Sequence, residues 1–328
     1  MKQVHDRRMT AIARQDRSGF LRGLTHWLAG FVLATLLGGC AATGTPAVEV
    51  GTWLDRNGDA VHEATVLDRI QAADVVLLGE VHDSAAVHRQ QLTMLRALDR
   101  PIVLALEQLD LGVPGSPDVM NVDLDAIGPK QRAKQGGFDF EGWGWKHYGG
   151  LFEQATARQW PLWPLNLPRR KALAVAMAGE EAWQDQLQTQ EVEAIERFGP
   201  GLALPEIHQA NLVEDLQQAH CGRIDAESAR GLARAQVARD MLMADALLKA
   251  HRDYPEHLVV GVMGNQHARL DRGAGFWLQR SAGNRQGVVA IGMLPIDSVE
   301  TPAQAAPAYD FVWITEPVDR DVGCESGS

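Results

Sequence analysis

Cysteine is scarce in this chain: three cysteines stand among 328 residues, at Cys40, Cys221 and Cys324. They form no CxxC pair and no Cys/His cluster, which excludes a structural zinc module of the usual ligand spacing. A small scaffold held together by many disulfides is excluded as well, because such scaffolds need several cysteine pairs.

Basic residues are also few. Lys and Arg number 31 against 42 Asp and Glu, a net charge of −11, and the first 39 residues hold six of the basic residues but only two of the acidic ones. The rest of the chain is therefore more acidic than the whole. This charge excludes nucleic acid as a partner, because phosphate contacts need basic surface, and it argues against a polybasic patch that would bind a membrane.

The apolar run near the start of the chain is too short to span a membrane. It covers residues 27–37, 11 residues, whereas a spanning helix needs about 20. Basic residues precede it, and Leu37-Gly38-Gly39-Cys40 follows it and resembles a bacterial lipobox. The order of these features predicts a lipoprotein signal peptide over residues 1–39. An ordinary cleaved signal and an apolar core helix are the alternatives, and neither explains all three features in this order.

By the lipobox resemblance, Cys40 is the lipidated first residue of the mature chain, and residues 40–50 form a tether. Several acyl chains would hold the protein firmly to a membrane without spanning it. The two alanines after Cys40 indicate sorting to the outer membrane of a bacterial envelope. Cys221 and Cys324 then remain, and they either pair in an oxidising compartment or stay as two free thiols.

Three segments, far apart in the sequence, each run from an apolar stretch into acid or imidazole: residues 75–83, 102–108 and 258–267. Each apolar half is rich in Val, Ile and Leu and does not alternate with polar residues, as is typical of a strand buried on both faces. In open α/β sheets, ligands bind beyond the carboxyl ends of such strands. The ends of these segments are therefore the predicted site.

Strand-like runs vanish between residues 168 and 254, where helix-forming residues dominate. The predicted fold is α/β, a parallel or mixed sheet flanked by helices, with an inserted small helical bundle. The α/β domain is expected over residues 51–167 and 255–316, the helical subdomain over residues 168–254, and a tail over residues 317–328. The Gly/Pro/Asp-rich stretch from residue 109 to 137 is long for a loop and is expected to border the site.

Ionisable side chains close the three predicted strands. Because neighbouring strands lie about 4.8 Å apart, adjacent strand ends would bring Glu80, His82, Glu107 and His267 into one pocket, with His88 one turn into the following helix. Two carboxylates and up to three imidazoles suit Zn, Mn, Co or Fe, and they serve equally as general acids and bases. Each residue also has a plainer explanation, such as a helix cap or a surface histidine, but three strands ending alike favour a functional site.

The long predicted helix over residues 225–252 carries Gln236 and Asp240 on the same face as Met243 and Leu247, because residues three and four apart share a face. Two polar residues on an otherwise apolar stripe indicate that the helix covers a polar group. The alternative is that they mark an exposed flank.

The chain resembles the ChaN-like haem-binding lipoproteins, in a superfamily with the Tiki proteases and the erythromycin esterases. The resemblance spans residues 51–294. It is carried by an ordered set of residues: Leu77-Leu78-Gly79-Glu80, His82, His88, Leu106-Glu107-Gln108, Trp145, Tyr148, Asn166-Leu167-Pro168-Arg169, Gln236, Asp240, Met243-Ala244 and Gly264-Asn265-x-His267.

The resemblance implies a lipoprotein that binds haem at the outer membrane for iron uptake, with haem held as a cofacial pair in a homodimer. It implies a tyrosine as the iron ligand, and Tyr148, which has tryptophan neighbours, is the candidate among three tyrosines. His147 and His208 are candidate second ligands. The remaining residues that the resemblance places at the haem are His88, Asn265, His267, Gln236 and Asp240.

A second hypothesis is a hydrolase, protease-like or esterase-like, that uses Glu80, His82, Glu107 and His267 with or without a divalent metal. The superfamily resemblance and the cluster at the strand ends both motivate it. A third hypothesis makes the helical subdomain a docking surface for an outer-membrane receptor, although charge patterning alone does not separate such a surface from an ordinary solvated one.

Overall fold

The computed structural model describes residues 48–112, 127–281, 287–298 and 300–318. The predicted signal peptide, Cys40, most of the tether and most of the C-terminal tail lie outside these residues. Contacts within the chain define residues 47–328 as one compact unit. Across the described residues, no helix combines the length and the apolar character that crossing a membrane requires. Cys221 is disulfide-bonded, so it is not a free thiol; the other two cysteines lie outside the described residues.

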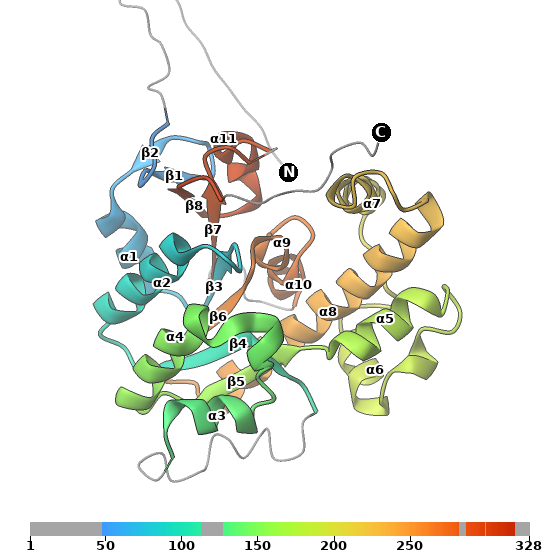
Figure 1. Ribbon diagram of the computed structural model, residues 1–328, viewed down its shortest axis with the longest axis horizontal. Helices are drawn as coiled ribbons and strands as arrows, with labels where there is room; N and C mark the ends of the chain where they lie inside the picture. The colour runs from blue at the N-terminus through green and yellow to red at the C-terminus, as the bar shows by residue number, and fades with distance from the viewer. Residues whose placement is uncertain (1–47, 113–126, 282–286, 299, 319–328) are drawn as a thin grey trace, which may run out of the picture. The chain divides into compact units, whose positions relative to one another are not determined.

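An eight-stranded mixed sheet forms the centre of the unit, with the strand order β2-β1-β8-β7-β3-β6-β4-β5 (Figure 1). Strand β1 pairs antiparallel with β2 and β8, and the other pairs are parallel. The strands are β1 (Trp53–Asp55), β2 (Ala60–Val61), β3 (Val75–Glu80), β4 (Ile102–Asp110), β5 (Leu162–Asn166), β6 (Leu258–Gly264), β7 (Val288–Pro295) and β8 (Phe311–Thr315).

Helices cover both faces of this sheet. They are α1 (Glu63–Gln71), α2 (Ala85–Ala97), α3 (Pro129–Gln135), α4 (Trp145–Ala157), α5 (Arg169–Met177), α6 (Thr189–Glu196), α7 (Glu206–Ala219), α8 (Ala226–Asp253), α9 (Asn265–Ala268), α10 (Ala274–Arg280) and α11 (Pro302–Ala305). Short turns of other helix types are η2 (Phe140–Gly144), η3 (Gln184–Gln186) and η4 (Ala306–Ala308). The α/β prediction is therefore confirmed.

The two faces of the sheet pack against different helices. On one face, Val76 and Leu78 of β3 join a core with α1, α2 and α4. On the other face, Val75 and Leu77 of β3 join a core with α5, α7, α8 and α10. The alternation follows from strand geometry, because successive side chains point to opposite faces. All six residues of β3 and all seven of β6 are buried, as the non-alternating apolar runs predict.

The segment from residue 168 to 254 is helical wherever it forms regular structure, and its long helix α8 packs directly on β5 and β6. This segment therefore supplies a helical layer to the second face of the sheet (Figure 1). That residues 168–254 form a separate subdomain stays a prediction.

A close approach at Gly79 joins β3 to the segment that follows β6. The side chain of Asn265 bonds the backbone of β7 at Met293, with Nδ2 donating to the carbonyl oxygen at 2.7 Å and Oδ1 accepting from the amide at 2.9 Å. A Cβ on Gly79 would lie 2.3 Å from Asn265 Oδ1, so only glycine fits there. Asn265, a candidate haem contact from the sequence, thus ties strands together.

Candidate functional site

The three strands that carry the predicted site are neighbours in the sheet, in the order β3-β6-β4. Glu80 lies opposite Gly264 in the parallel pairing of β3 with β6, and Leu106 of β4 lies opposite Val262 of β6. The carboxyl ends of all three strands therefore meet at one edge, as predicted. This edge is also where the chain order reverses across the sheet, the usual ligand position in open α/β folds.

Glu80 is the centre of a buried hydrogen-bond cluster on the face that α2 and α4 cover. Its Oε1 accepts from the Tyr148 hydroxyl at 2.6 Å and from Gln108 Nε2 at 3.0 Å, and it lies 2.8 Å from His82 Nδ1. Its Oε2 accepts from Gln91 Nε2 at 3.2 Å. With four donors around a side chain that is 0 % exposed, this carboxylate orients its neighbours and is not open to a ligand.

His88 supports the turn that carries His82. It is buried rather than on the surface, and its Nε2 lies 3.0 Å from the His82 carbonyl oxygen. Its Nδ1 lies 3.2 Å from Gln91 Oε1. The N-terminus of α2 is capped by Ser84, whose hydroxyl accepts from the Val87 amide, so the short turn after β3 is fixed at both ends.

Tyr148, the candidate iron ligand, is fully buried in α4. Its hydroxyl donates to Glu80 and does not face the cavity described below. Burial raises the pKa of this hydroxyl above its ordinary value, and the charge of Glu80 raises it further. His147 lies beside it and is half-buried, with its ring 5.5 Å from that of His88. His208 lies on α7, where its ring is 6.3 Å from that of Phe276.

Glu107 is the centre of a second buried cluster, on the opposite face of the sheet. Its Oε1 accepts from Arg239 Nη2 at 2.6 Å and its Oε2 accepts from the Gly264 amide at 2.7 Å. Burial by itself would raise the pKa of Glu107, but the charges of His267, Arg239 and His82, with the Gly264 hydrogen bond, hold it at about 2. Glu107 is therefore ionised at neutral pH.

His267 links this second cluster to α8. Its Nδ1 lies 2.5 Å from Asp240 Oδ1 and 3.0 Å from Gln236 Nε2, and its Nε2 lies 3.5 Å from Glu107 Oε1. Burial raises the pKa of Asp240 although His267 and Arg239 oppose the shift. The polar group that Gln236 and Asp240 were expected to cover is thus the imidazole of His267.

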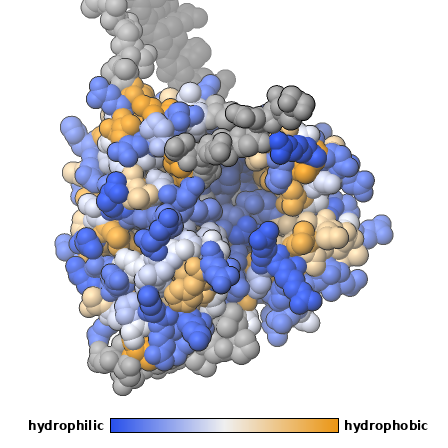
Figure 2. Space-filling model, in the orientation of Figure 1, coloured by the Kyte–Doolittle hydropathy of each residue, from blue (hydrophilic) through white to orange (hydrophobic). Residues whose placement is uncertain are grey.

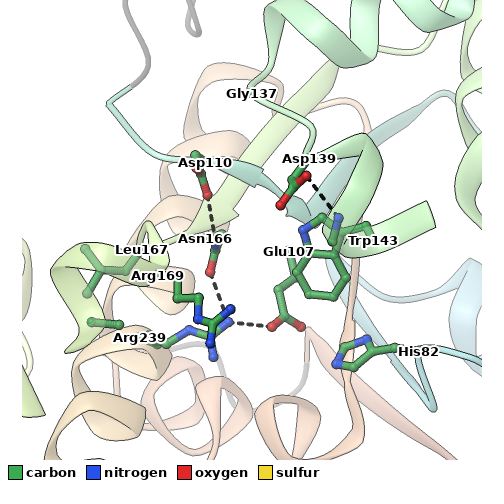
Figure 3. A pocket seen from close by; sticks show the side chains of 12 residues that line it. His82, Glu107, Asp110, Gly137, Asp139, Trp143, Asn166, Leu167, Arg169 and Arg239 are labelled. Carbon is green, nitrogen blue, oxygen red and sulfur yellow. Dashed lines mark hydrogen bonds and ion pairs between the residues drawn. The ribbon is translucent and has the colours of Figure 1, made fainter. Parts of the chain in front are cut away.

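A cavity of about 420 Å³ opens between the two clusters. Figure 2 shows this side of the molecule hollowed near its middle, with hydrophilic residues on the visible floor. Of the residues predicted at the site, His82 and Glu107 line the cavity, together with ten others: Asp110, Gly137, Asp139, Gly142, Trp143, Asn166, Leu167, Arg169, Ala172 and Arg239 (Figure 3). Asp110 and Gly137 lie at the two ends of the long loop that was expected to border the site.

His82 is the histidine among the described residues that line the cavity. Its side chain is 43 % exposed, and Figure 3 shows the ring pointing toward the Glu107 carboxylate. Burial lowers the pKa of His82, but the hydrogen bond to Glu80 and the charges of Glu107 and Glu80 outweigh burial, and the pKa is raised overall. Trp143 packs edge-on against the ring, at 5.0 Å between ring centroids.

Two arginines, Arg169 and Arg239, provide positive charge on the wall of the cavity opposite His82 (Figure 3). Arg239 is held by Glu107 and by Asn166 Oδ1, which accepts from its Nη2 at 2.9 Å. Arg169, at the start of α5, is exposed and makes no hydrogen bond or ion pair with any residue in the described part of the chain. Its guanidinium is therefore available to a ligand anion (Figure 3).

The donors do not suit a divalent metal. Within the described residues, no group of three or more His, Cys, Asp or Glu is placed to hold one. The physical reason is that Glu80 and Glu107 point to opposite faces of the sheet and already accept hydrogen bonds from protein donors. The predicted metal site formed by Glu80, His82, Glu107 and His267 is therefore not supported.

Some residues of the site were not predicted from the sequence. Arg239 is one, although it lies three residues after Gln236 and so shares a helix face with it. Gln91 is another, because no motif surrounds it in its helix. Gln108 belongs to the residues that carry the resemblance, but no role was predicted for it. Trp143 is placed by Asp139, whose carboxylate caps the turn Phe140–Gly144 by accepting from two backbone amides.

Comparison with known proteins identifies the family and a similar fold. The family model described as haem-binding uptake, Tiki superfamily, ChaN matches residues 66–277. No curated protein gives a significant match. The structure described as cofacial heme binding to ChaN of Campylobacter jejuni is similar over 80 % of this chain and 95 % of that chain, with a TM-score of 0.62 and 18 % identity. A mutant of the erythromycin esterase EreC in its open conformation matches at a TM-score of 0.41 and 14 % identity, over 82 % of this chain and 84 % of that one. Since the family model covers more than half of the sequence, the chain belongs to the ChaN-type haem-binding uptake family of the Tiki superfamily.

Proposed function

We propose that this protein binds haem as an envelope lipoprotein, anchored to the outer membrane through Cys40, and takes part in haem and iron uptake. The observation that supports haem as the ligand is the lining of the cavity. One wall carries the indole of Trp143 and the imidazole of His82, and the other carries the exposed Arg169 beside Arg239, which Glu107 already holds. Haem combines a flat apolar ring, a Lewis-acidic iron and two carboxylates. An indole packs on the ring, and guanidinium groups bind carboxylates.

The size of the cavity is compatible with this proposal. Its volume of about 420 Å³ lies within the range of roughly 300–1,000 Å³ that ligand sites occupy. His82 is partly exposed, so a planar ligand can extend beyond the cavity toward solvent. Family membership supports the same ligand independently.

A hemin titration tests the proposal. Full-length protein in detergent, at micromolar concentration, is expected to shift the Soret band of added hemin and to saturate at a fixed ratio of hemin to protein. Detergent with hemin alone is the control for partition into micelles. A linear, unsaturated absorbance change identical to that control would contradict the proposal.

Replacing Arg169 tests the anion-binding wall. Arg169→Ala is expected to weaken hemin binding about tenfold, because a hydrogen bond to a charged group contributes about 1.5–3 kcal/mol and about 1.4 kcal/mol is a factor of ten. Arg170→Ala is the matched control, since Arg170 is the exposed neighbour that does not line the cavity. Equal affinities of the two variants would exclude a role for Arg169.

The membrane anchor has its own test. Cys40→Ala should move the protein from the membrane fraction to the soluble fraction of cells, because the acyl chains are then never attached. Retention of the variant in the membrane fraction would exclude lipidation at Cys40 as the anchor.

A hydrolase that needs no metal is a second candidate, because two imidazoles each contact a carboxylate, His82 with Glu80 and His267 with Asp240. A carboxylate that orients an imidazole is the arrangement of a general base. Turnover of ester and peptide substrates by chelator-treated protein, lost in His82→Ala, would support it. Absence of turnover leaves haem binding alone.

A further inference from the structure

Two carboxylates of the cavity are not explained by haem binding. Asp110, at the end of β4, and Asp139, just before the turn η2, both line the cavity. Haem carries no cationic side group, and proteins hold haem iron through His, Cys, Met or Tyr rather than through Asp. The third carboxylate of the lining, Glu107, is already held by Arg239. Asp110 and Asp139 therefore present negative charge for which haem offers no partner.

Each of these two carboxylates uses one oxygen within the protein and leaves the other open. Asp110 Oδ1 accepts from Asn166 Nδ2 at 2.6 Å, and Asp139 Oδ1 accepts from the amides of Glu141 and Gly142, both at 3.0 Å. Neither Oδ2 accepts a hydrogen bond from any described residue. A Cβ at position 142 would lie 2.5 Å from Asp139 Oδ2, so the glycine there keeps this oxygen uncrowded.

The backbone holds the two aspartates near each other. The Asp110 amide donates to the Gly136 carbonyl oxygen at 3.2 Å, which fixes the end of β4 beside the segment that leads to Asp139. Burial raises the pKa of Asp110, Asn166 and Arg239 oppose the shift, and the charge of Asp139 raises the pKa further. A cationic group between the two carboxylates would relieve this repulsion.

An aromatic ring and a free guanidinium complete the lining. The Trp143 amide donates to the Asp139 carbonyl oxygen at 3.0 Å, and Trp143 lines the same cavity. An indole close to a carboxylate suits an ammonium group, because the ring face attracts cations. Figure 3 shows Asp110 and Asp139 on the side of Gly137, and Arg169 on the side of Arg239. Since Arg169 has no partner among the described residues, it can pair with a ligand carboxylate.

We propose that this cavity binds a small dipolar ligand of the amino-carboxylate class, whose simplest members are amino acids and short peptides. The ammonium group lies between Asp110 and Asp139, and the carboxylate lies on Arg169. The volume of about 420 Å³ is within the range for small-molecule sites. The inference goes beyond haem binding and does not depend on it, because haem uses neither aspartate. Both ligands use Arg169, so hemin is expected to compete with the dipolar ligand.

Calorimetry without hemin tests the inference. Full-length protein in detergent is titrated with alanine, dialanine and trialanine at millimolar concentration. At least one of them is expected to bind with a saturating heat, and the best length reports the spacing between the two subsites. The peptide of that length is then blocked at either end. The N-acetylated form lacks the ammonium group and the amidated form lacks the carboxylate, so each is expected to bind about tenfold more weakly, because each loses one charge-assisted contact.

Variants assign each end of the ligand to its residues. Asp110→Asn and Asp139→Asn keep the Oδ1 acceptor and remove the charge. Both are expected to weaken the free and the amidated peptide about tenfold and to leave the acetylated peptide unchanged. Arg169→Ala is expected to weaken the free and the acetylated peptide and to leave the amidated one unchanged. Asp99→Asn is the control, since Asp99 is exposed and does not line the cavity.

The outcomes separate this inference from haem binding. If no free peptide binds, or if free and blocked peptides bind equally, the inference is overturned, and a positive hemin titration still stands. Equal losses for all probes in every variant overturn it as well, because a purely structural role does not distinguish the two ends of a ligand. Peptide binding without hemin binding supports the inference and contradicts the haem proposal. Circular dichroism of each variant checks folding.

Discussion

Glu80→Ala is expected to lower the free energy of unfolding by about 4 kcal/mol. The substitution leaves the Tyr148 hydroxyl and the amides of Gln91 and Gln108 without their acceptor in a buried site, and each unsatisfied buried group costs about 1–3 kcal/mol. Urea unfolding followed by circular dichroism measures the change.

Two further variants make this test specific. Glu80→Gln keeps the shape and one acceptor oxygen, so it should cost about half as much as Glu80→Ala. Adding Tyr148→Phe to Glu80→Ala removes a donor that has already lost its acceptor, so the double variant should be less destabilised than the sum of the single variants. Additive effects, or a loss below about 0.5 kcal/mol for Glu80→Ala as at ordinary surface sites, would contradict the cluster.

Arg239→Ala is expected to cost about 3 kcal/mol of stability. Arg239 Nη2 lies 2.6 Å from Glu107 Oε1, and the Glu107 side chain is 2 % exposed. Because the pKa of Glu107 is about 2, the carboxylate stays charged when its partner is removed, and an uncompensated buried charge costs about 3–5 kcal/mol. The low end of that range applies, because the Gly264 amide still donates to Glu107. Urea unfolding measures this loss.

The control is Arg230→Ala, an exposed arginine on the same helix, which should change stability by less than about 0.5 kcal/mol. Combining Arg239→Ala with Glu107→Gln removes both charges and should restore part of the lost stability. If the double variant is no more stable than Arg239→Ala, the buried charge is not the cause.

Sequence reasoning identified the strands that carry the site but not the division of the site into two clusters. Period-two alternation places Glu80 on the same face as Val76 and Leu78, and it places Glu107 on the opposite face to Gln108. The alternation within each strand is readable from the sequence. Which face of β3 corresponds to which face of β4 is set by β6, which pairs with both, and no local pattern contains that information.

The role of Tyr148 also could not be read from local sequence patterns. Tryptophans close to it in sequence made it a candidate iron ligand. Whether its hydroxyl meets a cavity or a carboxylate depends on how α4 lies on β3, a contact between residues 68 positions apart. The tertiary contact with Glu80, rather than the aromatic neighbourhood, determines where the hydroxyl points.

The sequence by itself determined the α/β class, the three strands that end in acid or imidazole, the long helix with Gln236 and Asp240 on one face, and the family. These follow from local periodicity and from the ordered set of residue types, both of which a single chain carries in full. Only the tertiary structure decided that Glu80 and Glu107 lie on opposite faces, that Arg239 neutralises Glu107 and that His82 faces the cavity. These depend on strand register and helix packing, which bring together side chains that are distant in the sequence.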